Sequence, residues 1–185
     1  AEGPERSLLR GERLALNVLQ RMSGIATQTA KMAELIKGTR AIILDTRKTT
    51  PNLRFLEKMA VRMGGGQNHR MGLYDMIMLK DNHIDFAGGI KPAIEKARIY
   101  MAEKGLTIPI EVETRNMNEL KEVLDTGGVD RVMFDNFTVE ETYKAVELVN
   151  RKLETESSGG ITEKTIRAYA ETGVDFISVG ALTHS

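Results

Sequence analysis

Apolar and polar residues alternate along the chain with two different periods, one typical of helices and the other typical of buried strands. Between positions 12 and 36, apolar residues recur every three or four positions, which predicts one long amphipathic helix. Further along, short apolar runs are separated by helix-length amphipathic segments. These runs predict six strands, at positions 40–48, 76–81, 108–113, 131–135, 153–157 and 176–179.

Helix start signals follow several of the predicted strands. Pro51 suits the first position of a helix, where its missing N–H costs no hydrogen bond. Asn116 precedes Glu119 by three residues, and Thr138 precedes Glu141 in the same way, which is the pattern of a capping box. The predicted helices cover 52–63, 91–104, the segments that begin at 116 and 138, and 162–172. This alternation of strands and helices indicates an α/β fold with a parallel sheet.

The polar residues at the strand ends favour a barrel over an open sheet. The first four predicted strands end in Lys48, Asp81, Glu113 and Asp135. An open doubly wound sheet gathers ligand groups at one switch point, whereas a barrel gathers them from all of its strands. We therefore expect residues 39–185 to form a parallel six-stranded (β/α) barrel of the TIM-barrel type. Residues 1–38 would form an N-terminal segment and the linking helix.

The composition excludes several classes of function. Among the 185 residues, 26 acidic side chains balance 26 basic ones, so no overall field favours nucleic acid or an anionic membrane. Cysteine is absent, which excludes thiolate metal sites, and the three histidines show no metal-binding spacing. No apolar run reaches the length of a membrane span. We expect a cytoplasmic protein with no nucleic-acid or membrane partner.

A local cluster of basic residues stands out against this neutral background. Arg47, Lys48, His69, Arg70 and Lys80 all lie near the ends of the first two strands or in the loops between them. Parallel strands bring such groups to one edge of the sheet, which suits an anionic small molecule. The alternative for each residue taken singly is a surface ion pair.

Two late loops carry the glycines expected of a phosphate site. Ser158, Gly159 and Gly160 follow the fifth strand, and Gly180 follows the sixth. Glycine lets backbone N–H groups approach phosphate oxygens, and the last loops of such barrels often bind phosphate near a helix start. Taken singly, these glycines fit tight turns equally well; taken as a pair of loops, they favour phosphate.

The acidic strand ends have three possible uses. Glu113 and Asp135 could bind Mg²⁺ brought by a polyphosphate substrate, accept hydrogen bonds from sugar hydroxyls, or pair with the nearby lysines. Glu111 lies two residues before Glu113 and should share its face of the strand, which makes a role inside the barrel possible.

Several long motifs resemble one known family. They include Asp-Thr-Arg-Lys-Thr at 45–49, Gly-Gly-Gly-Gln-Asn-His-Arg at 64–70, Leu-Lys-Asp-Asn-His-Ile at 79–84 and Thr-His-Ser at 183–185. In this order they resemble quinolinate phosphoribosyltransferase, the carboxylating nicotinate-nucleotide pyrophosphorylase. The resemblance implies a six-repeat α/β barrel after an N-terminal α+β domain that is absent from this chain. It also implies transfer of phosphoribosyl to quinolinate with loss of CO₂, a step of NAD biosynthesis.

The same resemblance implies a role for each matching residue. Quinolinate would be bound by Arg47, His69, Arg70 and Lys80. Phosphoribosyl pyrophosphate and its Mg²⁺ would be held by the catalytic residues Lys48, Glu113 and Asp135, with Glu113 and Asp135 as the metal ligands. The 5-phosphate would be surrounded by Ser158, Gly159, Gly160, Gly180 and His184. Arg13 is similar to a family arginine that enters a neighbouring subunit's site, which implies a homodimer or a higher homo-oligomer.

Three other functions remain open at this point. A nicotinate phosphoribosyltransferase would use a similar site without decarboxylation. An unrelated aldolase-like lyase would use Lys80 as a Schiff-base amine. A non-catalytic phosphate-binding barrel fragment would bind ligands without turnover, because the family's first domain is missing.

Overall fold

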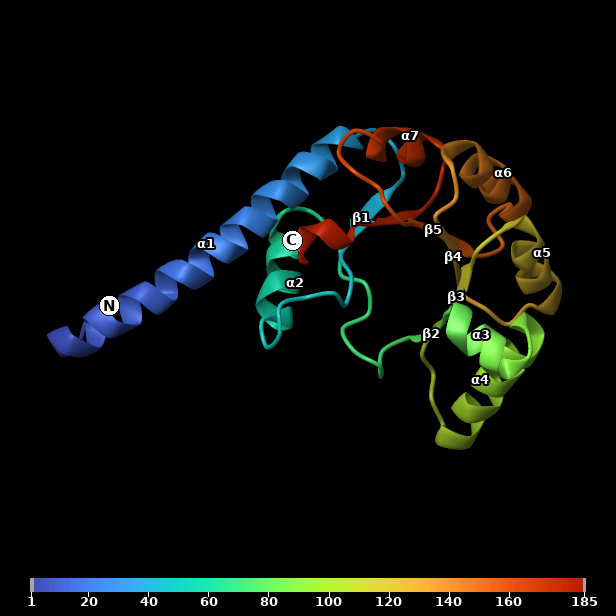
Figure 1. Ribbon diagram of the computed structural model, residues 1–185, viewed down its shortest axis with the longest axis horizontal. Coiled ribbons are helices and arrows are strands. Elements are labelled where there is room, and N and C mark those ends of the chain that lie inside the picture. The colour runs from blue at the N-terminus through green and yellow to red at the C-terminus, as the bar shows by residue number, and fades with distance from the viewer. Residues whose placement is uncertain (1, 185) are drawn as a thin grey trace.

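The computed structural model describes residues 2–184 and shows a parallel sheet curved into an arc, with helices along its outside (Figure 1). The strands are β1 (Ile42–Leu44), β2 (Ile77–Leu79), β3 (Ile110–Thr114), β4 (Arg131–Asp135), β5 (Glu154–Ser158) and β6 (Phe176–Ser178). The helices are α1 (Glu5–Leu35), α2 (Arg54–Met63), α3 (Asp81–Ala87), α4 (Ile90–Lys104), α5 (Met117–Thr126), α6 (Val139–Val149) and α7 (Ile166–Glu171). A short 3-10 helix, η1 (Gly180–Leu182), follows β6.

The predicted six-stranded parallel α/β barrel is confirmed, with one opening in its wall. The strand order is β1-β6-β5-β4-β3-β2, so β1 and β2 are the two edges and do not pair with each other. Residues 66–70, which we call the strap, lie on the free edge of β1. The N–H of Gln67 donates to the carbonyl of Ile43 at 2.8 Å, and its carbonyl accepts from the N–H of Asp45 at 3.3 Å. The strap therefore supplies the wall where a strand ladder is missing.

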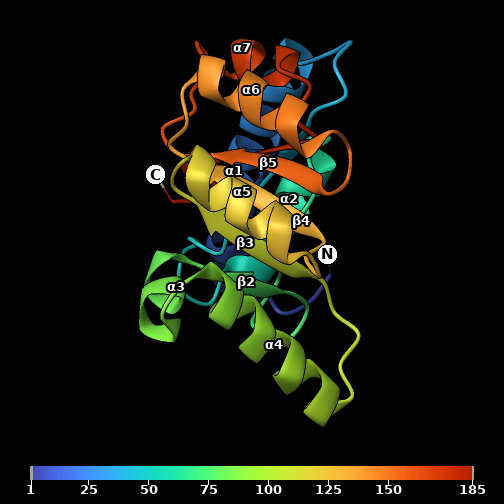
Figure 2. The ribbon, with the colours of Figure 1, turned by 90° about the vertical axis from the view of Figure 1, so that its right-hand side faces the viewer.

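The two faces of the sheet differ sharply in polarity. Ile43, Val112, Val132 and Ile177 are almost completely buried and belong to the apolar core between the sheet and the helices. Figure 2 shows α4, α5 and α6 covering this outer face. Alternate residues point into the barrel, because successive side chains of a strand face opposite ways. Most of these inward residues on β3, β4 and β5 are charged or polar, so the fold directs chemistry to the interior.

Helix α1 buries residues only in its C-terminal part. It begins at Glu5, earlier than the predicted position 12, and its buried residues are Ile25, Thr29 and Met32. The N-terminal half projects away from the barrel (Figure 1). Although α1 has 31 residues, no helix in the described part of the chain is long and apolar enough to cross a membrane.

Several local expectations need correction. Pro51 does not open a helix: Asn52 has a φ of 64°, which interrupts helical geometry, and α2 begins only at Arg54. Strand β2 ends at Leu79, and the unpredicted helix α3 starts at Asp81, where the backbone N–H of Lys80 donates to Nδ1 of His83 at 3.1 Å. Helix α7 begins at Ile166 instead of 162.

The two predicted capping boxes have different outcomes. At Thr138 the box is complete, because Glu141 accepts from the Thr138 N–H at 2.8 Å and Thr138 accepts from Glu141. Asn116 does cap α5 through the N–H groups of Asn118 and Glu119. The Glu119 carboxylate, however, accepts from the N–H of Arg115, one residue before the expected partner.

Candidate active site

Two connected cavities open at the carboxyl ends of the strands. The inner chamber has a volume of about 200 Å³ and is lined by Thr46, Arg47, Lys48, His69, Arg70, Met78, Lys80, Glu113, Met133, Asp135, Glu156, Ser158 and Ser178. The outer chamber, of about 700 Å³, shares several of these residues and adds the loops after β5 and β6 with Gly159, Gly160, Gly180 and His184. All predicted site residues line one or both chambers except Arg13. Arg13 is exposed on the projecting half of α1.

Two acidic residues, Glu113 and Asp135, line both chambers together with Lys80. Lys80 Nζ lies 2.5 Å from Glu113 Oε2. Burial and the nearby charge of Glu113 raise the pKa of Asp135, and Asn136 donates to its carboxylate at 2.8 Å. Two mutually repelling carboxylates that line the same cavities suit a hard divalent cation. Schiff-base lysines lie in apolar surroundings or beside another cation, whereas Lys80 pairs with an acid, which disfavours the aldolase-like reading.

The inner chamber holds cations that lack acidic partners. Among the described residues, neither Arg47 nor Arg70 forms an ion pair within 4 Å. Burial lowers the pKa of Arg70, and the charge of Arg47 lowers it further. Two neighbouring guanidinium groups that repel each other in a half-buried chamber suit a small dianion, since each can hold a carboxylate through two hydrogen bonds.

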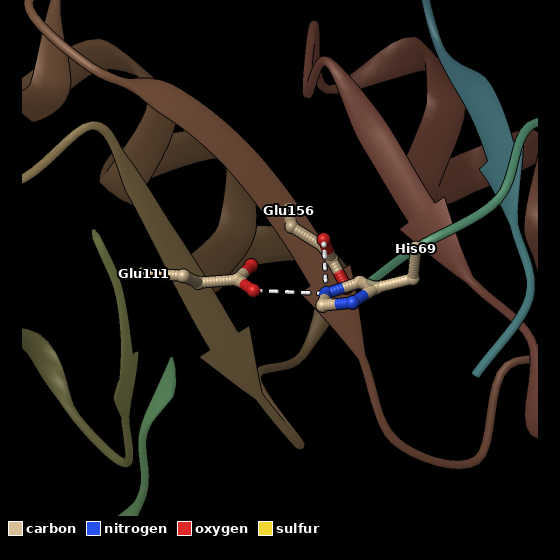
Figure 3. A group of neighbouring side chains, drawn as sticks. All are labelled: His69, Glu111 and Glu156. Carbon is tan, nitrogen blue, oxygen red and sulfur yellow. Dashed lines mark ion pairs between the residues drawn. The ribbon is translucent and has the colours of Figure 1, made fainter. Parts of the chain in front are cut away.

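A buried charged cluster borders this chamber, and two of its members, His69 and Glu156, also line it. Figure 3 shows His69 from the strap between Glu111 of β3 and Glu156 of β5. His69 Nε2 is 2.8 Å from Glu111 Oε2 and 3.5 Å from Glu156 Oε2. On the other side, Arg131 Nη1 lies 3.2 Å from Glu156 Oε2, and its guanidinium stacks on the Phe176 ring at 4.0 Å. Acidic and basic side chains thus alternate in the cluster, in the order Glu111, His69, Glu156 and Arg131.

The proton balance of this cluster follows from its geometry. Burial lowers the pKa of His69, but its hydrogen bonds to Glu111 and Glu156 outweigh that effect and raise it to about 9. Burial and the charge of Glu156 raise the pKa of Glu111 to about 7. The N–H of Arg70 lies 2.7 Å from His69 Nδ1, while His69 Nε2 faces Glu111 at 2.8 Å. Because these groups are in contact, His69 and Glu111 titrate as a pair.

Three ligand atoms of this cluster, one each from His69, Glu111 and Glu156, lie within 4.8 Å of one another, a spacing that a metal ion could bridge. Two observations argue against such a use. A histidine that binds metal through Nε2 carries its proton on Nδ1 and donates it to an acceptor, but here Nδ1 faces the N–H of Arg70. Arg131 also brings a positive charge to Glu156. The cluster is better described as a self-compensated ion network.

The glycine loops form the rim of the outer chamber. Gly159 and Gly160 have φ values of 99° and 59°, and a Cβ atom at Gly159 would overlap the side chain of Asn136. A Cβ atom at Gly180 would lie 2.7 Å from Nε2 of His184, which brings these two predicted residues into contact. Because α7 starts six residues after Gly160, no α-helix begins directly at this loop. The backbone and His184 are what this rim offers to an anion.

Sequence reasoning missed Glu156 and the inward-facing Ser178. Both could have been found by alternation, because Glu156 lies two residues before Ser158 on the same strand, and Ser178 two residues before Gly180. The predicted inward orientation of Glu111 is borne out by its contact with His69.

Comparison with known proteins agrees with this geometry. Residues 25–185 match the family described as "Quinolinate phosphoribosyl transferase, C-terminal domain". A chloroplastic nicotinate-nucleotide pyrophosphorylase [carboxylating] from Oryza sativa is 46% identical over 99% of this chain and 53% of its own length. A probable enzyme of the same name from Bacillus subtilis is 48% identical over 99% of this chain and 62% of its length.

Solved structures give the same result. NadC from Streptococcus pyogenes superposes with a TM-score of 0.90 and 45% identity, over 98% of this chain and 62% of its own. The nicotinate-nucleotide pyrophosphorylase from Francisella tularensis superposes with a TM-score of 0.91 and 45% identity, over 98% of this chain and 63% of its own. The chain spans just over half the length of the curated relatives it matches. The chain belongs to the quinolinate phosphoribosyltransferase family, and residues 25–185 correspond to its C-terminal domain.

Proposed function

We propose that this chain carries the catalytic barrel of an enzyme that transfers phosphoribosyl from phosphoribosyl pyrophosphate to quinolinate, a pentosyltransferase of NAD biosynthesis. The products are nicotinate mononucleotide, pyrophosphate and CO₂. The observation that carries the proposal is the pair of connected chambers: one has arginines without acidic partners, and the other has a glycine rim. A dianionic acid and a sugar phosphate have the charges that these two chambers match.

In the inner chamber, Arg47 and Arg70 bind the two adjacent carboxylates of quinolinate. Their guanidinium groups have no competing acid within 4 Å among the described residues, so the substrate supplies the counter-charge. Lys80 borders both chambers and stands between the bound acid and the acidic pair. This arrangement orients the ring nitrogen towards the sugar in the outer chamber, which lowers the entropic part of the barrier.

In the outer chamber, the loop at Ser158, Gly159 and Gly160 binds the 5-phosphate together with Gly180 and His184. Glu113 and Asp135 would hold Mg²⁺, which supplies positive charge to the departing pyrophosphate when it is bound. Lys48, exposed at the rim, adds a further positive charge for the same leaving group. The carboxylates of Glu113 and Asp135 also stabilise the positive charge that develops at C1 of the ribose.

The chemistry needs no covalent nucleophile from the protein. The ring nitrogen of quinolinate forms a bond to C1 of the ribose while the bond from C1 to pyrophosphate breaks. The ring nitrogen becomes cationic, and the electron pair of the bond to the 2-carboxylate moves into the ring as CO₂ leaves. A proton then takes the place of CO₂ at C2. The role of the protein is to position and to balance charge.

The test is a product analysis with the full-length protein. With phosphoribosyl pyrophosphate, Mg²⁺ and quinolinate labelled in the 2-carboxylate, we expect equal amounts of labelled CO₂ and nicotinate mononucleotide. Nicotinate, which carries one carboxylate, should be a poor substrate. Nucleotide formation without CO₂, or equal use of both acids, would favour the nicotinate-type enzyme, and binding without turnover would favour a phosphate-binding fragment.

We also propose that the protein acts as a homodimer or higher homo-oligomer with shared sites. Leu9, Leu14 and Leu19 are more than half exposed on the half of α1 that projects from the barrel, and Arg13 lies among them. Leu14 and Val18 also line an apolar groove of about 190 Å³ against α2. A second copy of the chain covers this surface and receives Arg13 in its own site. Mixing an Arg13→Ala protein with a Lys80→Ala protein should restore activity, and failure to do so would contradict shared sites.

The location within the cell stays a prediction. We propose the cytoplasm, although the rice relative is described as chloroplastic and a tobacco relative as mitochondrial. Fractionation of cells that express the full-length protein would decide among these compartments.

A further inference from the structure

We infer that Asp45 and Lys58, which line neither chamber, position the strap so that His69 and Arg70 form the acid-binding wall. This inference rests on the proposed function, because it names the substrate whose binding the pair controls. The two residues come from different elements: Asp45 follows β1, and Lys58 lies on α2. Both side chains are fully buried and form an ion pair with each other.

The ion pair holds both backbone groups of one residue. Asp45 Oδ1 accepts a hydrogen bond from the N–H of His69 at 2.9 Å. Lys58 Nζ donates to the carbonyl of the same residue at 3.1 Å. The donor and the acceptor of His69 are therefore fixed by the negative and the positive member of one pair, which sets the position and the orientation of this residue together.

Asn68 ties the preceding residue to the same pair. Its Nδ2 donates to Asp45 Oδ2 at 2.5 Å and to the backbone carbonyl of Lys58 at 2.8 Å. Gly66 completes the fit, because a Cβ atom there would lie 2.9 Å from Val61 and 3.0 Å from Thr29. The strap is thus fixed from behind by side chains and packing.

The missing strand ladder makes this support necessary. β1 and β2 do not pair, so the strap contacts the sheet through β1 alone, and no strand lies on its other side to align it. In front, the His69 side chain reaches Glu111 at 2.8 Å, and Arg70 follows directly in the chain. A shift of the strap would therefore move the acid-binding arginine and disturb the buried network at once.

A purely structural role predicts a different outcome from a positioning role. His69 and Arg70 line the inner chamber but not the outer one. Loss of the ion pair should weaken quinolinate binding and leave binding of phosphoribosyl pyrophosphate intact. General destabilisation would change both ligands alike. The separation of the two affinities is therefore the informative measurement.

The experiment uses the full-length protein with the double substitution Asp45→Asn and Lys58→Met, which removes both charges and leaves neither partner buried alone. Calorimetry should show at least about tenfold weaker binding of quinolinate, with phosphoribosyl pyrophosphate unchanged within about twofold. Steady-state kinetics should show the same split, with KM for quinolinate raised more than KM for the other substrate. Arg40→Met is the matched control, because Arg40 pairs with Asp175 at the opposite end of β1 and β6.

Asn68→Ser provides a second variant, since it removes one arm of the support and keeps the ion pair. This variant should also bind quinolinate more weakly with phosphoribosyl pyrophosphate binding unchanged, but by a smaller factor than the double variant. Unchanged quinolinate binding in a folded double variant, or equal weakening of both ligands in the two variants, would overturn the inference. If the unaltered protein binds phosphoribosyl pyrophosphate but no quinolinate, the proposed substrate itself is wrong, which is a separate result.

Discussion

Two pairs of acidic side chains lie inside the barrel, and they differ in their exposure to the cavities and in their pairing with cationic groups. The upper pair, Glu113 and Asp135, borders both chambers and is compensated only in part, by Lys80. The lower pair, Glu111 and Glu156, is buried and pairs with cationic groups: Glu111 Oε2 lies 2.8 Å from His69 Nε2, and Glu156 Oε2 lies 3.2 Å from Arg131 Nη1. A shift of two residues along strand β3 thus separates an acid available for ligands from an acid committed to the fold.

The comparison indicates that a buried carboxylate with permanent cationic partners is not available to bind a ligand or a metal ion. Taking a carboxylate out of water is expensive unless its partners are already in place. The lower pair has such partners, so its substitution should change stability. In the proposed function the upper pair receives a cation that enters with substrate, so its substitution should change turnover. The following predictions test this division.

The largest effect is expected from Arg131→Met. This change removes the arginine partner of the fully buried Glu156, which then keeps only the longer contact with His69, and it removes the stacking on Phe176. Loss of one member of a buried ion pair typically destabilises by about 3–5 kcal/mol. Chemical denaturation should report this loss, and Arg115→Met, which removes an exposed arginine, should leave stability unchanged. A stable Arg131→Met protein would show that the lower pair needs no compensation.

The upper pair should show the opposite behaviour. Asp135→Asn removes one charge of the proposed cation site, and we expect kcat to fall about 100-fold, which corresponds to about 2.7 kcal/mol. Stability should hold or rise, because burial and Glu113 already raise the pKa of Asp135 and thus oppose its ionisation. Parallel measurement of kcat and of the unfolding midpoint checks this. A large loss of stability with unchanged kcat would reverse the assigned roles.

The pH dependence of stability tests the lower cluster without substrate. In the folded protein the pKa of His69 is raised to about 9, above its ordinary value of 6.5. The stabilisation is therefore complete below pH 6.5 and is lost as the pH rises towards 9, by on the order of 3 kcal/mol. His69→Gln should abolish this slope, and His83→Gln, at the exposed start of α3, should keep it. A flat profile for the unaltered protein would contradict stabilisation of charged His69 by Glu111 and Glu156.

The smallest effect concerns the wall of the inner chamber. Arg70→Lys retains the positive charge but loses the planar donor pair that matches a carboxylate. We expect quinolinate to bind about tenfold more weakly, or about 1.4 kcal/mol, with a larger loss in Arg47→Ala. Titration with quinolinate and nicotinate would show whether the preference for the dianion falls. If the Arg70→Lys protein bound quinolinate as tightly as the unaltered protein does, Arg70 would not be one of the residues that bind the acid.

The sequence was informative wherever a local rule decides the outcome. Polar residues at the ends of apolar runs predicted the strands that carry Lys80, Glu113 and Asp135 to one cavity. The pattern of Thr138 and Glu141 predicted a cap that depends on only four residues. Both signals are short-range, although the same capping pattern at Asn116 and Glu119 was realised only in part, because Glu119 accepts from the N–H of Arg115.

The remaining features depend on packing between distant segments. The opening between β1 and β2, and its closure by the strap, follow from the curvature of the whole sheet, which no local pattern encodes. Glu156 sits in a strand of sequence Glu-Thr-Glu-Ser-Ser, whose polarity hides that it is buried. Helix α3 was missed because Lys80 to Asp81 reads equally well as the end of a strand. Arg13 lies outside both chambers of its own chain, so its predicted role depends on a second copy.

The opening in the barrel wall has a consequence for changing the acid that the site accepts. Exchange of residues 66–70 would leave all five strand pairings of the sheet untouched, because the strap contributes only an isolated bridge. A segment held by side-chain contacts can be changed with few substitutions, whereas a strand paired through a ladder of backbone hydrogen bonds must keep its register. The strap is therefore a part of this barrel where specificity can change without loss of strand register, provided that Gly66 and His69, which hold its packing and the buried network, are kept.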